Sequence, residues 1–138
     1  MYNVRKIQDD IYWLGASDRR LEKFENTYSV PAGMSYNNYL ILDEKTCLVD
    51  GIDYNVAQQF FENLEFALQG RTLDYMIVNH MEPDHCGNIE DLLMLYPKMK
   101  IVGNTFQPRI QVSTINVTYN CLILKRHYEV TIPPFKSA

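Results

Sequence analysis

The chain has 138 residues, enough for one domain, and its 46% hydrophobic and 22% charged content is that of an ordinary globular protein. A net charge of −4, without a basic stripe in the first hundred residues, argues against a nucleic-acid partner. No apolar run reaches the length of a membrane span, and none follows the N-terminus as a signal sequence would. Three cysteines without paired spacing favour reduced thiols. We therefore expect a cytoplasmic protein with no membrane partner.

Strand-like runs appear first in chain order. Residues 11–14 are apolar and end at a glycine, whereas residues 15–38 are rich in turn-forming residues and are expected to form a long loop. Residues 39–42 and 46–49 are almost continuously apolar and flank a polar turn, which predicts a buried hairpin. Residues 75–78 predict another buried strand, and a further strand starts at Ile101.

Two helices are expected between these strands. Asp53 can cap a helix in which Val56, Phe60, Leu64 and residues 67–68 recur at helical spacing, and Gly70 marks its end. Asn88 can cap a second, short helix that stops before Pro97. The alternation of strands and helices predicts an α/β fold.

The chemistry is concentrated in residues 80–85, which directly follow the strand at 75–78. His80, Glu82, Asp84 and His85 place four possible metal ligands within six positions, although the chain has only three histidines. Strand ends deliver such ligands to the edge of an α/β sheet, where open folds carry their sites. Pro83 favours an extended backbone at Glu82, so His80, Glu82 and Asp84 are expected to project to one side.

The ligand types suggest which metal is bound. Carboxylates mixed with imidazoles suit iron or manganese, while zinc remains possible. The crowding of four ligands suggests that they are divided between two adjacent ions.

Three segments together resemble the flavodiiron proteins. The resemblance covers residues 1–103 and is carried by residues 13–25, by residues 35–45 and above all by residues 79–87, with the pattern Asn-His-x-Glu-Pro-Asp-His-x-Gly. It implies the N-terminal half of a metallo-β-lactamase-like αββα sandwich. It also implies that His80 and Glu82 bind one iron, Asp84 binds the other, and His85 binds or adjoins the second.

The resemblance further implies an oxidoreductase that reduces O₂ to water or nitric oxide to nitrous oxide at two irons. In that family the electrons come from FMN in a flavodoxin-like domain, usually of the other subunit of a homodimer, and a rubredoxin-like carrier often supplies the flavin. The iron and the flavin would perform the redox chemistry, and the protein would hold and tune them.

The chain departs from the family after Gly103. Residues 1–103 carry a net charge of −7 and residues 104–138 a net charge of +3, and after the motif only His127 could serve as a further histidine ligand. We expect His127 to be a solvated residue and Cys86 a packing residue. Residues 104–138 are expected to be a divergent tail, and the chain is expected to be a truncated or frame-shifted product without the flavin domain.

Three functions therefore stay open, and whether this chain is itself an enzyme is not decided by its sequence. The first is the diiron domain of a flavodiiron oxidoreductase, expected to have little activity alone. The second is a metal-dependent hydrolase of the metallo-β-lactamase superfamily, which would use a metal-bound hydroxide. The third is a non-catalytic fragment that needs a partner chain, because half of a layered fold exposes apolar surface.

Overall fold

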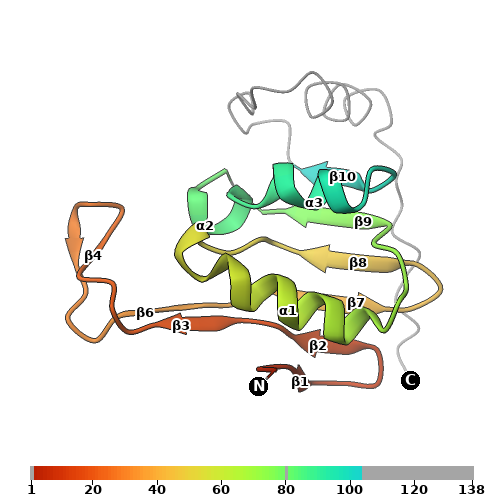
Figure 1. Cartoon of the computed structure of the whole chain (residues 1–138), viewed down its shortest axis with the longest axis horizontal. Helices are drawn as coiled ribbons and strands as arrows, with labels where there is room; N and C mark the ends of the chain where they lie inside the picture. The colour runs from red at the N-terminus through yellow and green to blue at the C-terminus, as the bar shows by residue number, and fades with distance from the viewer. Residues whose placement is uncertain (1, 80, 104–138) are drawn as a thin grey trace.

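A six-stranded mixed sheet organises the molecule, whose computed structural model describes residues 2–79 and 81–103 (Figure 1). The strand order is β1-β2-β7-β8-β9-β10, with bounds Arg5–Lys6, Ile11–Trp13, Tyr39–Leu42, Thr46–Val49, Tyr75–Val78 and Lys100–Gly103. The pairs from β1 to β8 are antiparallel, and β8, β9 and β10 are parallel to one another. The α/β class and the predicted hairpin are thus confirmed.

Helices connect the parallel strands and lie on one face of the sheet, in front of it in Figure 1. A 3₁₀ turn, η1 (Tyr54–Val56), leads into α1 (Ala57–Leu68) between β8 and β9, and α2 (Pro83–Cys86) and α3 (Ile89–Leu95) lie between β9 and β10. Parallel neighbours need such crossovers, because a tight turn cannot return the chain to the same end of the sheet.

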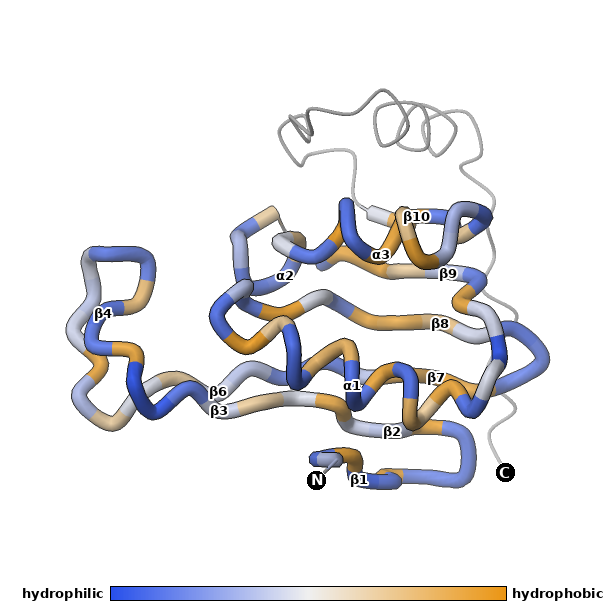
Figure 2. The backbone as a smooth tube through the Cα atoms, in the orientation of Figure 1, coloured by the Kyte–Doolittle hydropathy of each residue, from blue (hydrophilic) through white to orange (hydrophobic). Residues whose placement is uncertain are grey.

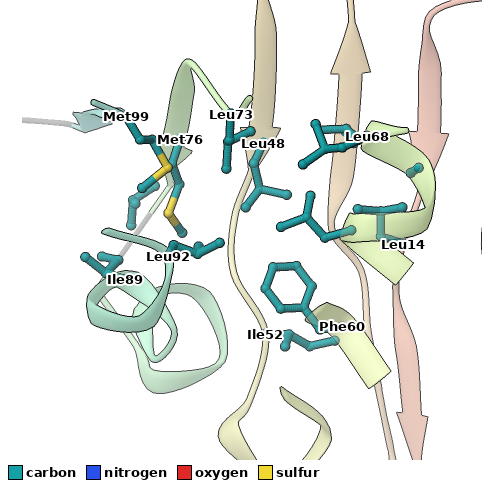
Figure 3. Packing of buried hydrophobic residues seen from close by; sticks show 14 of the residues in the cluster. Leu14, Leu48, Ile52, Phe60, Leu68, Leu73, Met76, Ile89, Leu92 and Met99 are labelled. Carbon is teal, nitrogen blue, oxygen red and sulfur yellow. The ribbon is translucent and has the colours of Figure 1, made fainter. Parts of the chain in front are cut away.

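The core lies between that face and the helices (Figure 3). Leu40, Leu48, Met76 and Ile101 face one another in register across four strands, and all are at most 1% exposed. Phe60 of α1 and Leu92 of α3 pack onto this row and belong to the same buried cluster. Each fully buried side chain of this size contributes about 1.5–3 kcal/mol, so the core holds the sheet and the helices in one arrangement.

Helix α1 begins and ends where the sequence predicts. The Asp53 carboxylate accepts a hydrogen bond from the Asn55 N–H at 2.8 Å, which caps the turn that leads into the helix. The apolar side of α1 faces the sheet, and Figure 2 shows its alternating hydrophobic and hydrophilic residues. After Leu68 the backbone turns left-handed at Gln69 and Gly70, with φ of 50° and 82°, which ends the helix.

The expected loop at residues 15–38 is wrong in part. It contains β3 (Ala16–Asp18) paired with β6 (Met34–Tyr36), and β4 (Lys23–Phe24) paired with β5 (Tyr28–Ser29). Each strand has only two or three residues, too few for an alternating apolar pattern to show in the sequence.

Within residues 2–79 and 81–103, no helix is long and apolar enough to cross a membrane. The predicted tail at 104–138, with His127, lies outside the described residues.

Candidate functional site

The proposed ligands follow β9, the strand between β8 and β10, at its carboxyl end. Glu82 has an extended backbone, with φ of −74° and ψ of 151°, as the following proline predicts. Pro83 then occupies the first turn of α2, where its missing N–H costs nothing. Asp84 and His85 therefore lie on a helical turn, and His80 lies outside the described residues.

The expected common projection of His80, Glu82 and Asp84 is wrong for Asp84. Alternation of side chains requires an extended strand, and α2 begins at Pro83. The helix instead brings Asp84 and His85 together, with 3.5 Å between the Asp84 Oδ2 and the His85 Nε2. Glu82 is exposed at the start of the turn. Among the described residues no three such side chains gather closely enough to hold a metal ion.

One oxygen of Asp84 is left for a ligand. Its side chain is only 16% exposed, and Oδ1 is buried without a hydrogen-bond partner among the described residues. A buried carboxylate oxygen without a partner is costly, and a cation is the partner that would best satisfy it. This atom is the observation in the structure that fits a metal ion beside His85.

Asp50 is a site residue that the sequence analysis missed. It directly follows β8, is 5% exposed and has a left-handed backbone with φ of 62°. Its carboxylate accepts hydrogen bonds from Asn79 N and Nδ2 at 2.8 and 2.7 Å, and its Oδ2 lies 3.0 Å from the His85 Nδ1. The carboxylate therefore faces one imidazole nitrogen while the other faces Asp84. An acid at the carboxyl end of the neighbouring parallel strand was the available signal.

A second group of acids surrounds Tyr36. The pKa of the Tyr36 hydroxyl is raised to about 12, mainly by burial and then by the negative charges of Asp53, Asp18 and Asp84, in that order of importance. Asp53 and Asp84 also line a pocket of about 220 Å³ together with Pro83 and residues of the β4–β5 hairpin. Asp84 therefore borders this pocket, while its Oδ1 is buried.

Cys86 packs beside the site. Its Sγ lies 3.3 Å from the Met81 carbonyl oxygen, to which it donates a hydrogen bond, and the side chain packs against the core. Burial raises the pKa of the Cys86 thiol, and the charge of Asp84 raises it as well. The contact of this side chain with the core agrees with the expected packing role.

Comparison with known families gives one match over most of the chain. A family model described as "ODP family beta lactamase" matches residues 34–127, a range that contains Asp50 and the whole motif. The boundary expected at residue 103 lies inside this range and stays a prediction.

Curated relatives match the same part of the chain. It is 36% identical over 96 residues to the anaerobic nitric oxide reductase flavorubredoxin of Vibrio vulnificus, a match that covers 69% of this chain and 19% of that protein. The protein of the same name from Aliivibrio salmonicida is 37% identical over 92 residues, covering 66% and 18%. The chain thus spans about a fifth of the length of these relatives.

Solved structures match the fold. A mutant of the flavo di-iron protein from Thermotoga maritima superposes with a TM-score of 0.74 and 30% identity, covering 83% of this chain and 30% of that one. The rubredoxin oxygen:oxidoreductase of Desulfovibrio gigas gives a TM-score of 0.66 and 29% identity, covering 72% and 25%.

Proposed function

This chain belongs to the ODP family of β-lactamase-like domains, the metallo-β-lactamase-like part of flavodiiron proteins, and from that premise we propose that it is the iron-binding part of an oxidoreductase acting on nitric oxide or O₂. The substrates are taken from the names of its relatives, a nitric oxide reductase and an oxygen oxidoreductase. The observation that carries the proposal is the buried Asp84 Oδ1 without a partner among the described residues, beside the His85 imidazole.

His80, Glu82, Asp84 and His85 would hold the iron. A carboxylate and imidazole set suits this metal, and the buried Asp84 oxygen supports its placement. When bound, a pair of ferrous ions supplies electrons to a diatomic substrate. The described residues end before the further iron ligands that the family carries later in its sequence, and they include no flavin domain.

The chain's own residues orient and shield such a site. Asp50 approaches the His85 Nδ1 at 3.0 Å, which favours the Nε2 of the same ring as the ligand atom. Asn79 donates two hydrogen bonds to Asp50 and so fixes the orienting carboxylate. The pocket at Asp84 and Asp53, at about 220 Å³, has ample room for a diatomic molecule.

The remaining parts of the proposal concern the complete system. FMN in a flavodoxin-like domain would supply electrons, and a rubredoxin-type carrier would reduce the flavin, in keeping with the names flavorubredoxin and rubredoxin oxygen:oxidoreductase. In subunits that also carry the flavin domain, a homodimer would bring the flavin of one subunit to the iron of the other. A cytoplasmic location agrees with the free thiols of Cys47 and Cys86.

Iron analysis of the full chain tests the central claim. The protein is purified without oxygen, loaded with ferrous iron, and passed over a desalting column before its iron content is measured. We expect close to two irons per chain, and loss of most of this iron in D84N, which keeps the shape of the side chain and removes its charge.

A matched control separates site binding from general attraction of cations. E44Q removes the same charge from the exposed β7–β8 turn, at the opposite end of the parallel strands, and should keep the iron. Equal iron in the wild type, D84N and E44Q would refute the site. Preferential binding of zinc with hydrolysis of esters would refute the oxidoreductase and favour the hydrolase.

A further inference from the structure

A fully buried asparagine ties the candidate site to the core. Asn88 connects α2 to α3 and is 0% exposed. It stands at the N-cap position of α3, but its side chain makes no capping hydrogen bond there. Its Oδ1 instead accepts a hydrogen bond from the Ile52 N–H at 2.8 Å, across 36 positions of sequence. The side chain therefore makes a long-range hydrogen bond instead of the helix-capping hydrogen bond that its position predicts.

The turn that Asn88 holds is the turn that carries Asp50. Ile52 is 0% exposed, so its N–H has no access to water if the asparagine is removed. The preceding residue is bound to the same segment, because the Gly51 N–H donates to the His85 carbonyl at 2.7 Å. Two consecutive backbone donors thus attach residues 51 and 52 to the segment from His85 to Asn88.

The fit between the two segments is close. A Cβ on Gly51 would come within 2.9 Å of the His85 carbonyl oxygen and 3.1 Å of the Asn88 Oδ1. Asp50 meanwhile has a left-handed backbone with φ of 62°, which is uncommon for residues other than glycine and which aspartate adopts more readily than most. Asn79 holds the Asp50 carboxylate from the other side, so release of the turn would loosen the segment from His85 to Asn88 and separate the His85 Nδ1 from that carboxylate.

We propose that Asn88 is a positioning residue of the site: its side-chain carbonyl holds the turn at residues 50–52 against α2 and thereby keeps the Asp50 carboxylate on the His85 imidazole. Its importance for iron binding rests on the function proposed above. Its effect on the imidazole does not, because the contacts exist in the chain without metal.

The test reads the imidazole directly in the metal-free, full-length chain. Nitrogen-15 NMR at about pH 8.5, where an ordinary imidazole is neutral, shows which ring nitrogen of His85 carries the proton. The wild type should show a protonated Nδ1, facing Asp50. N88A should show the two nitrogen signals shifted toward a common average. Hydrogen exchange of the Ile52 amide should also become faster by on the order of tenfold, because one buried hydrogen bond is lost.

Asn63 provides the matched control. It is equally buried at 0%, and its side chain accepts from the Asn3 N–H and donates to the Leu14 carbonyl, away from the site. N63A should lower the unfolding midpoint and leave the His85 signals unchanged. Wild-type signals in N88A, averaged signals in the wild type, or equal changes in N63A would each overturn the proposal.

A second variant serves if alanine prevents folding. Serine in N88S keeps a small polar side chain but is too short to reach the Ile52 N–H. We expect N88S to show averaged His85 signals and faster exchange of the Ile52 amide. Wild-type signals in N88S would contradict a role for the acceptor. If these NMR results are obtained and the chain binds no iron, only the proposed metal site is refuted.

Discussion

The two ends of the parallel strands β8 and β9 use the same kind of polar contact for different purposes. At the first end, the Asp74 carboxylate accepts from the Thr46 N–H, and the Thr46 hydroxyl donates to the Thr72 carbonyl and accepts from the Asp74 N–H. At the other end, Asp50 accepts twice from Asn79 and approaches His85, yet Asp84 keeps a buried oxygen without a partner among the described residues.

The polar network around Thr46 is closed, whereas the network around Asp50 is open. The contacts around Thr46 satisfy one another, and among the described residues this group has no buried side-chain atom without a hydrogen-bond partner, so they stabilise the sheet. The contacts around Asp50 orient an imidazole whose other nitrogen faces the Oδ2 of Asp84, and the second oxygen of that carboxylate, Oδ1, has no partner among the described residues. Ligands of α/β sheets gather at the carboxyl ends of the strands, which is the end that carries the open network here.

Breaking the Asp50 network should have the largest effect. D50A removes a buried carboxylate that accepts two hydrogen bonds, and we expect a loss of about 3–5 kcal/mol in the free energy of unfolding, measured with urea. Alanine also strains the left-handed backbone at φ of 62°, at a cost of about 1 kcal/mol. D50G removes the carboxylate without this strain and should be the more stable of the two. Equal stability of D50A and the wild type would contradict the network.

Breaking the Thr46 network should cost less and spare the site. T46V keeps the shape of a side chain that is 1% exposed and removes the hydroxyl, which leaves the Thr72 carbonyl and the Asp74 N–H without their partner. We expect a loss of about 2 kcal/mol in urea unfolding and an unchanged iron content. T46S retains the hydroxyl and should lose less. Loss of iron in T46V would show that the two ends of the strands are coupled.

Alkaline pH should cause a smaller loss of stability, through a thiol that lies between the two ends of the strands. Burial raises the pKa of the Cys47 thiol, on β8, from 9.0 to about 11. The stability from this shift is fully present below the unfolded pKa and is lost as pH rises toward the folded one, because the unfolded thiol ionises first. We expect stability to fall by about 1 kcal/mol between roughly pH 9 and 11, after allowance for partial exposure. The fall should be smaller in C47A, and an identical fall in both proteins would refute the assignment.

Much of the fold could be predicted because it depends on neighbours in sequence. The apolar runs at 39–42, 46–49 and 75–78, and the helical spacing from Val56 to Leu68, each report burial through a local pattern. The six-residue motif likewise marked the place of the candidate site, since its residue types are informative without coordinates. The fold class and the family were therefore accessible from the sequence.

Only the tertiary structure decided how the site is assembled. The contacts of Asp50 with His85 and of Ile52 with Asn88 join residues far apart in the chain, and no periodicity predicts such pairs. Spacing placed Asn88 as a helix cap, but its buried side-chain carbonyl accepts from the Ile52 N–H instead, because an unsatisfied N–H inside the core is costly. Local preference determined the elements, and the packing of distant segments determined which side chains meet at the site.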